Sequence, residues 1–176
     1  MIDEITPNAL ALAGQVLERG RALKIMIAAA ESCTGGLVAA ALTAIAGSSD
    51  VFERGFVTYS NEAKVEMLGF DPETIRKHGA VSREVALGMA VGALRRSRAQ
   101  LSIAVTGIAG PGGGSPDKPV GLVHFAAASA LSRRPDITDF DAIHHEERFG
   151  DIGRARVRER SVEVALRLLL KAADLP

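Results

Sequence analysis

Short apolar runs alternate with amphipathic segments along the chain. Residues 25–30 and 101–105 are almost wholly apolar, a pattern that is typical of strands covered on both faces. Residues 120–128 predict a further strand, and residues 140–149 predict a more polar strand at an edge of the sheet. Segments with helical spacing lie between these runs. The alternation predicts an α/β fold, a three-layer α/β/α single domain with a mixed, largely parallel sheet.

Capping residues mark where the helices begin. Thr6-Pro7 is typical of a helix start, and Gly20 is the predicted end of that first helix. Further helix starts are predicted at Ser60 or Asn61, at Asp71-Pro72 and at Ser82. The last helix is predicted from Arg154 onward, because apolar residues then recur on one face.

Composition excludes several classes of function. The chain has 176 residues, which predicts one domain over residues 1–176. Lys+Arg and Asp+Glu number 21 each, so no net field recruits nucleic acid or an anionic membrane. Aromatic residues make up only 4% of the chain, too few for a platform that stacks nucleic-acid bases. We therefore expect a small-molecule ligand, with no nucleic acid and no membrane as partner.

Cysteine usage and the termini predict the compartment. Cys33 is the single cysteine, so no internal disulfide forms, and the Cys and His spacings match no zinc site. Residues 1–7 lack the apolar stretch of a signal peptide, and no segment reaches the roughly 20 apolar residues of a membrane span. A cytoplasmic protein without a bound metal is expected.

The turn after the first predicted strand is a candidate site. Glu31-Ser32-Cys33-Thr34-Gly35-Gly36 joins the apolar run to an Ala/Leu-rich segment. Glycine lets the backbone approach a ligand, and a strand-to-helix turn exposes a nucleophile in hydrolase elbows. Ser and Thr that merely cap the helix are the alternative. Ser32 is thus one candidate nucleophile, and a buried Cys33 is expected to be inert.

Two further elements could complete a hydrolytic site. Ser49, in the break Gly47-Ser48-Ser49, is a second candidate nucleophile. Lys64 lies close to a predicted helix start, where the helix dipole disfavours another positive charge. Burial there would lower the pKa of Lys64 and make it a base for a serine, as in Ser-Lys hydrolases. A solvated surface lysine is the alternative. Tyr59 could relay a proton or belong to the core.

A loop and an arginine cluster indicate where a ligand could bind. Residues 106–119 are rich in Gly and Pro and follow a strand, where α/β proteins place ligands. The loop matches neither a Walker A nor a dinucleotide fingerprint. Arg154 and Arg158 lie four residues apart on one helix face, an arrangement that suits a phosphate or carboxylate. A solvated helix face is the alternative.

Longer motifs resemble a known family. Beside the turn already described, they are Gly47-Ser48-Ser49, residues 55–64, His78-Gly79-Ala80-Val81-Ser82, residues 106–111 and Lys118-Pro119-Val120-Gly121. In this order they resemble the C-terminal domain of CinA (competence/damage-inducible protein A) over about residues 6–172. The resemblance implies hydrolysis of nicotinamide mononucleotide to nicotinate mononucleotide and ammonia, in pyridine-nucleotide salvage, without a cofactor. No counterpart of the family's molybdopterin-binding-like N-terminal domain is expected in this chain.

The resemblance also implies roles for residues. A Ser-Lys type mechanism is expected, with Ser49 or Ser32 as nucleophile, Lys64 as base and Tyr59 nearby. The expected substrate-binding residues are Thr34, Gly35, Gly36, Ser48, Thr106, Gly107, Ala109, Gly110, Gly112, Arg154 and Arg158. A homo-oligomer is expected. The alternative function is a non-catalytic nucleotide-binding or regulatory module linked to competence or the DNA-damage response.

Overall fold

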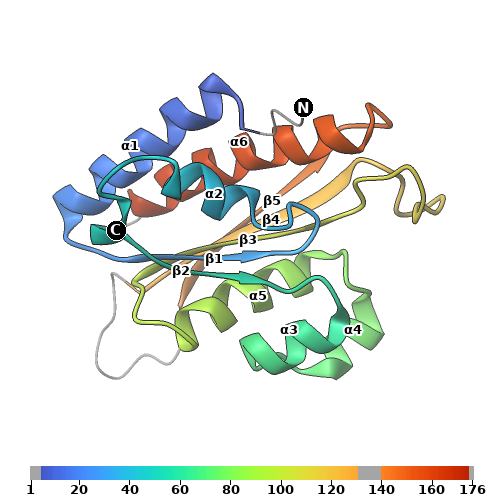
Figure 1. Ribbon diagram of the computed structural model, residues 1–176. Helices are drawn as coiled ribbons and strands as arrows, with labels where there is room; N and C mark the ends of the chain where they lie inside the picture. Colours follow the sequence, from blue (N-terminus) through green and yellow to red (C-terminus); the bar gives the residue numbers. More distant parts are fainter. Residues whose placement is uncertain (1–4, 131–139, 175–176) are drawn as a thin grey trace.

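The computed structural model of the chain describes residues 5–130 and 140–174. Five strands in this part form one sheet, in the order β2-β1-β3-β4-β5 (Figure 1). They are β1 (Ile27–Glu31), β2 (Phe52–Val57), β3 (Leu101–Gly107), β4 (Leu122–Ser129) and β5 (Asp141–Arg148). β1 pairs in parallel with β2 and β3, whereas β4 pairs antiparallel with β3 and β5. Only β4 among the described strands runs against the others, which confirms the predicted mixed, largely parallel sheet.

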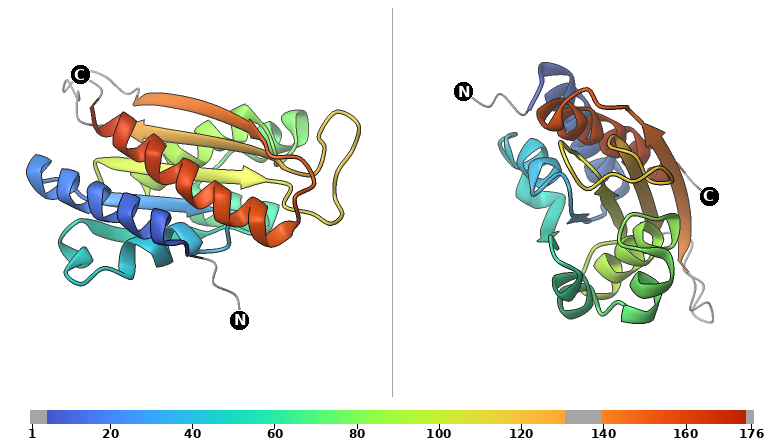
Figure 2. Two further views of the ribbon diagram at one scale, coloured as in Figure 1. Left: turned by 90° about the horizontal axis from the view of Figure 1, so that it is seen from above. Right: turned by 90° about the vertical axis from the view of Figure 1, so that its right-hand side faces the viewer.

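Helices cover both faces of the sheet (Figures 1 and 2). One layer contains α1 (Pro7–Leu23), α2 (Leu37–Thr43) and α6 (Arg154–Ala173). The other layer contains α3 (Asn61–Leu68), α4 (Pro72–His78) and α5 (Arg83–Arg95). A short 3₁₀ helix, Ser48–Asp50, leads into β2. The three-layer α/β/α prediction is therefore confirmed.

The central strands present larger side chains to one layer than to the other. Ile103 and Phe125 pack into the core beneath α1, α2 and α6. Their neighbours Ala104 and Ala126 face α5, which itself presents Met89 and several alanines. Alternate residues of a strand point to opposite faces, so this pattern is set by the sequence of each strand. Small side chains on the α5 side allow that helix to lie close to the sheet.

Gly20 does not end α1 as its sequence context predicts. The helix continues to Leu23 and ends at Lys24, whose φ of 56° is left-handed and whose N–H donates to the carbonyls of Gly20 and Arg21. A Cβ atom at position 20 would lie 2.3 Å from Cγ1 of Val51. The glycine is thus required for close packing. The helix starts predicted at Thr6, Ser60, Asp71 and Ser82 are confirmed, because each of these side chains caps its helix.

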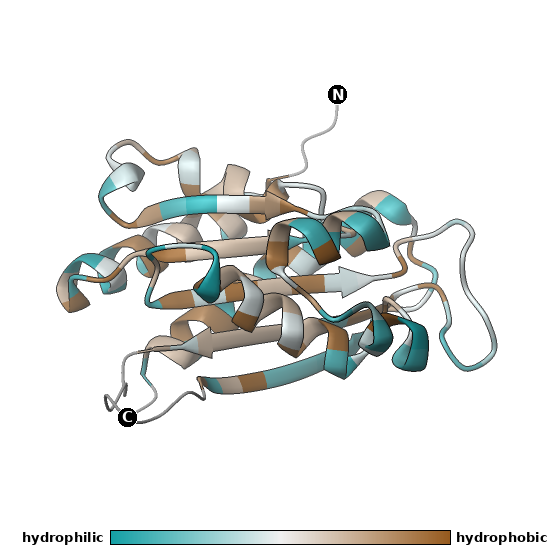
Figure 3. Cartoon of the chain, turned by 90° about the horizontal axis from the view of Figure 1, so that it is seen from below, coloured by the Kyte–Doolittle hydropathy of each residue, from teal (hydrophilic) through white to brown (hydrophobic). Residues whose placement is uncertain are grey.

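The two outer strands differ from the central ones in polarity. Hydrophilic residues colour much of β2 and β5 in Figure 3, whereas the central strands are largely hydrophobic. Charged side chains on an edge strand discourage pairing with another sheet. β5 is therefore the polar edge strand that the sequence predicts.

A histidine pair crosses from β4 to β5. His124 Nδ1 and His144 Nε2 lie 2.9 Å apart, and His124 is buried. Burial lowers the pKa of both rings, and for His124 the carboxylate of Glu146, 3.9 Å away, opposes this shift. The folded protein therefore holds the rings neutral at a pH where free histidine begins to take up a proton.

We expect this pair to make the protein less stable as the pH falls from about 6.5 to 5. The unfolded chain protonates its histidines near pH 6.5, whereas the folded rings do so only at lower pH. The free energy of unfolding then falls by up to about 1.4 kcal/mol per pH unit for each extra proton bound by the unfolded chain. Urea unfolding at a series of pH values measures it. His124→Gln should flatten this dependence and His145→Gln should not; an equally steep curve for His124→Gln would contradict the assignment.

Candidate active site

The turn after β1 holds Ser32 through its backbone. The Ser32 N–H donates to the carbonyl of Val105 in β3 at 2.9 Å, and the Ser32 carbonyl accepts from the N–H of Gly35 at 3.0 Å. Gly35 and Gly36 have φ values of 61° and 101°, a left-handed region that favours glycine. Ser32 is partly exposed, so a ligand can reach a hydroxyl whose backbone is fixed by the sheet.

Lys64 contacts Ser32 from α3, the helix that follows β2. It lies in the first turn of α3, which Ser60 caps, and its side chain is only 1% exposed. Lys64 Nζ lies 3.2 Å from Ser32 Oγ, and it donates to the Thr58 carbonyl at 2.8 Å and to the Ser60 carbonyl at 3.4 Å. The parallel pairing of Glu31 with Val57 brings the two segments together.

The surroundings of Lys64 disfavour its charged form. Burial lowers the pKa of Lys64, while the carboxylate of Glu62 acts in the opposite direction. In the described structure the hydrogen-bond partners of its amine are a hydroxyl and two carbonyls, and none is a carboxylate. Burial also raises the pKa of the Cys33 thiol to about 12, so this thiol stays protonated. The chemistry available here is that of a serine hydroxyl beside an amine.

Two arginines of α6 reach the same end of the sheet. Arg154 donates to the Gly110 carbonyl at 3.0 Å and to the Tyr59 hydroxyl at 2.6 Å. Arg158 donates to the Thr34 carbonyl at 3.1 Å. Tyr59 thus contacts Arg154, and the described structure gives it no hydrogen bond to Lys64 or Ser32. Through these contacts the start of α6 is linked to the turn after β1, the loop after β2 and the Gly-rich loop.

The Gly-rich loop is fastened to the segment between α4 and α5. Lys118 Nζ donates to the carbonyls of His78 and Val81, at 2.6 and 2.8 Å. At the end of β3, the buried Thr106 donates its hydroxyl to the Ala80 carbonyl at 2.8 Å. Thr106 therefore ties the start of the Gly-rich loop to the segment between α4 and α5. Of the remaining loop candidates, Gly107 is partly exposed, Ala109 and Gly110 are buried, and Gly112 is exposed.

The structure does not bring Ser48 and Ser49 to Lys64 within the chain. Both lie in the 3₁₀ helix before β2, next to Val51, whose carbonyl accepts from the N–H of Ile27 at the start of β1. They are therefore at the amino ends of these strands. Ser32 and Lys64 follow the carboxyl ends, roughly 13 Å away along β1 at about 3.3 Å per residue. The Ser49 alternative therefore lacks its base in this geometry.

Sequence reasoning missed three acceptor groups of this site. The carbonyls of Thr58 and Ser60 receive the Lys64 amine, and the carboxylate of Glu31 receives backbone N–H groups of α2. Main-chain acceptors leave little trace in a sequence. Glu31 does leave one, because a charged residue that directly ends a buried apolar strand needs partners.

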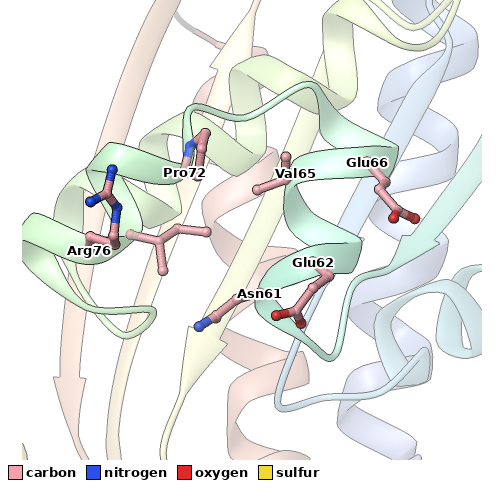
Figure 4. A pocket seen from close by; sticks show the side chains of 7 residues that line it. Asn61, Glu62, Val65, Glu66, Pro72 and Arg76 are labelled. Carbon is pink, nitrogen blue, oxygen red and sulfur yellow. The ribbon is translucent and has the colours of Figure 1, made fainter.

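A separate groove lies between α3 and α4 (Figure 4). Its volume is about 380 Å³, and it is lined by Asn61, Glu62, Val65, Glu66, Pro72, Ile75 and Arg76. Lys64 and Ser32 are not among these residues, so the groove is distinct from their contact. Within residues 5–130 and 140–174, no group of three or more His, Cys, Asp or Glu side chains could hold a metal ion. No helix in those ranges could span a membrane.

Solved structures and sequence relatives resemble this chain closely. The crystal structure of the competence/damage inducible protein CihA from Agrobacterium tumefaciens has a TM-score of 0.88 and 51% identity, covering 96% of this chain and 97% of that one. The nicotinamide-nucleotide amidohydrolase PncC of Escherichia coli K12 is 53% identical over 135 residues, which are 72% of this chain and 82% of that protein.

Other relatives are longer proteins. A CinA-like protein of Syntrophobacter fumaroxidans is 47% identical over 152 residues, 86% of this chain but only 34% of its own length. The chain thus spans about a third of that relative. The family model of the CinA C-terminal domain matches residues 9–173. This chain belongs to the CinA C-terminal domain family.

Proposed function

We propose that this chain is an amidohydrolase that converts nicotinamide mononucleotide to nicotinate mononucleotide and ammonia through a Ser32–Lys64 pair. The observation that carries the proposal is the 3.2 Å contact between Lys64 Nζ and Ser32 Oγ, with an amine that is buried and, in the described structure, is hydrogen-bonded to no carboxylate. The activity named for the Escherichia coli relative, at 53% identity, supports the substrate. Pyridine-nucleotide salvage in the cytoplasm is the role that this reaction would serve.

The three oxygen partners of Lys64 can serve a neutral amine. A neutral amine has two N–H groups and one lone pair, whereas the charged form has three donors and no acceptor. The carbonyls of Thr58 and Ser60 can take the two N–H groups. The lone pair then faces Ser32 Oγ and accepts the hydroxyl hydrogen. Lys64 would thus act as a general base for Ser32 without a histidine.

The reaction follows from this arrangement in two halves. Ser32 Oγ attacks the amide carbon while its proton moves to Lys64 Nζ. Lys64 returns that proton to the departing nitrogen as the C–N bond breaks, and ammonia leaves an ester on Ser32. Water then attacks the ester, gives a proton to Lys64, and the Ser32 oxygen takes it back as the acid is released.

The oxyanion of each half requires donors other than the Ser32 N–H, which already donates to Val105. Two turns with backbone N–H groups come into question, and one of them, the Ser48–Ser49 turn, lies at the amino ends of the strands. The Gly-rich loop lies at the carboxyl ends, and we assign the oxyanion donors to its backbone. One such donor commonly lowers the barrier by about 3 kcal/mol.

Arg154 and Arg158 are the proposed phosphate ligands. Their guanidinium groups contact the Gly-rich loop and the turn after β1, so both lie at the same edge of the sheet as Ser32. A guanidinium group presents paired donors that fit phosphate oxygens. Tyr59, which accepts a hydrogen bond from Arg154, would orient this arginine and leave proton transfer to Lys64.

Ammonia release tests the function directly. Purified protein is incubated with nicotinamide mononucleotide and EDTA, and both ammonia and nicotinate mononucleotide are measured. Equal amounts of the two products are expected, at a rate that EDTA does not change. Nucleotide binding without any product would contradict the enzyme and favour a binding or regulatory module.

The two serines give opposite expectations. Ser32→Ala should lower kcat at least about a thousandfold, because the attacking oxygen is lost. Ser49→Ala should keep kcat within about twofold, because this residue lies at the other end of β1. Steady-state kinetics on nicotinamide mononucleotide measures both. The reverse ranking would show that Ser49 is the nucleophile.

Lys64→Ala should lower kcat by a similar factor, since no other base contacts Ser32 in the described structure. Binding of nicotinate mononucleotide should change little, because its phosphate would be held by the arginines. Lys77→Ala, at an exposed lysine of α4, is the matched control and should keep full activity. Turnover by Lys64→Ala near the wild-type rate would exclude this base.

The lowered pKa of Lys64 also predicts a pH dependence of stability. An unfolded lysine binds its proton up to about pH 10.4, so burying this amine costs stability below that pH. The cost shrinks as the pH rises from 7 to 10. Lys64→Met lacks this contribution, so wild type should gain stability relative to the variant over the same range. Urea unfolding of both proteins measures the difference; a constant difference would mean that the pKa is not lowered.

A further inference from the structure

Glu31 is a buried carboxylate next to the candidate nucleophile. It is the last residue of β1, and its side chain is 1% exposed. Oε2 accepts from the N–H groups of Gly36 and Val38, at 3.1 and 3.0 Å, and Oε1 accepts from the N–H of Ala39 at 2.9 Å. No ion pair to Glu31 occurs in residues 5–130 and 140–174. Backbone donors alone therefore hold this carboxylate in the described structure.

These three donors form the start of α2. The residue before that helix, Gly36, has no side chain to cap it. The carboxylate of Glu31 caps the helix from across the turn, where a negative charge also meets the positive end of the helix dipole. The strand end and the helix start are thereby joined into one closed turn that contains Ser32.

The turn is held at independent points on either side of Ser32. The Ser32 N–H is bound to Val105 of β3, and its carbonyl to the N–H of Gly35. Glu31 directly precedes Ser32, and its carboxylate binds the N–H groups at the far end of the turn. A hydroxyl on a backbone held in this way keeps one place relative to Lys64, whose amine is itself held by the Thr58 and Ser60 carbonyls.

We propose that Glu31 is a positioning residue, which keeps the Ser32 hydroxyl within reach of Lys64 by closing the turn onto α2. This rests on the proposed function for Ser32 and Lys64. Glu31 itself touches neither the amine nor the substrate. By closing the turn, Glu31 restricts its movement, so that Ser32 Oγ stays within hydrogen-bond distance of Lys64 Nζ.

Glu31→Gln tests the capping of α2 while keeping the size of the side chain. Glutamine matches glutamate in size, but it has one acceptor oxygen and one NH₂ group. In either orientation the NH₂ group faces backbone N–H donors, so the turn loses part of its closure. Glu31→Asp keeps both oxygens on a shorter side chain and should retain part of the function. Asp71→Ala is the matched control, because Asp71 caps α4 through the Glu73 N–H.

The experiment measures kcat, KM and the pH profile of these variants on nicotinamide mononucleotide, with unfolding midpoints. Glu31→Gln should lower kcat about 10- to 100-fold, the scale of a displacement of roughly 1 Å. Its KM should stay within about threefold, and the pKa that governs kcat should stay as in wild type, because Lys64 is unaltered. Glu31→Asp should fall between. Asp71→Ala should lose stability and keep kcat.

A serine-reactive fluorophosphonate gives a second readout that needs no nucleotide. Labelling of Ser32, located by mass spectrometry, should be about 10- to 100-fold slower in Glu31→Gln and unchanged in Asp71→Ala. Equal labelling and equal kcat in folded Glu31→Gln would overturn the proposal and leave Glu31 as a helix cap. If Glu31→Gln does not fold, Glu31→Asp decides in the same way.

The same label separates the two proposals. A wild-type protein that is labelled at Ser32 but releases no ammonia would refute the substrate assignment, while the labelling rates still decide on Glu31. A wild-type protein that is not labelled at Ser32 lacks a positioned nucleophile and overturns the Glu31 proposal as well.

Discussion

The removal of the Lys64 amine from water is the constraint on which the site depends. A buried amine without a carboxylate needs other hydrogen-bond partners, and the Thr58 and Ser60 carbonyls provide them. These carbonyls are available only because β2 ends at Val57 and α3 begins at Asn61, leaving a short irregular segment between. The parallel pairing of β1 with β2 then places Ser32 at the same edge. The sheet register thus determines which hydroxyl meets the amine.

Long-range contacts complete this edge of the sheet. α6 is far from the other site segments in sequence, yet Arg154 and Arg158 contact three of them. The apolar residues of α6 pack on the sheet in the same layer as α1 and α2. This packing brings the first turn of α6 to the carboxyl ends of the parallel strands. Two arginine charges are therefore placed by the core, and they contact neutral oxygens of the loops. The buried His124 of β4 and the partly exposed His144 of β5 contact each other, and in the described residues neither has a hydrogen bond to Ser32 or Lys64.

Local signals predicted much of this fold from the sequence. Apolar runs located the central strands, and Ser60, Asp71 and Ser82 marked helix starts through their capping side chains. Lys64 was recognised as a possible base from its place near a helix start, although burial is the main cause of its lowered pKa. Ser32 and Ser49 looked alike in the sequence, since each follows a break near a helix. Their difference is which end of the sheet they occupy, a tertiary property. Gly20 looked like a helix end for a similar reason, because the close approach of Val51 comes from a distant residue.

The capping of α2 by Glu31 has a consequence for the binding of an anionic ligand. Helix starts commonly receive phosphate groups, but here the N–H groups of Gly36, Val38 and Ala39 are already bound to a carboxylate. A second anion at that place would meet negative charge. The start of α2 therefore has no donors left for an anionic ligand, and at this edge of the sheet such a ligand would depend on the guanidinium groups at the start of α6.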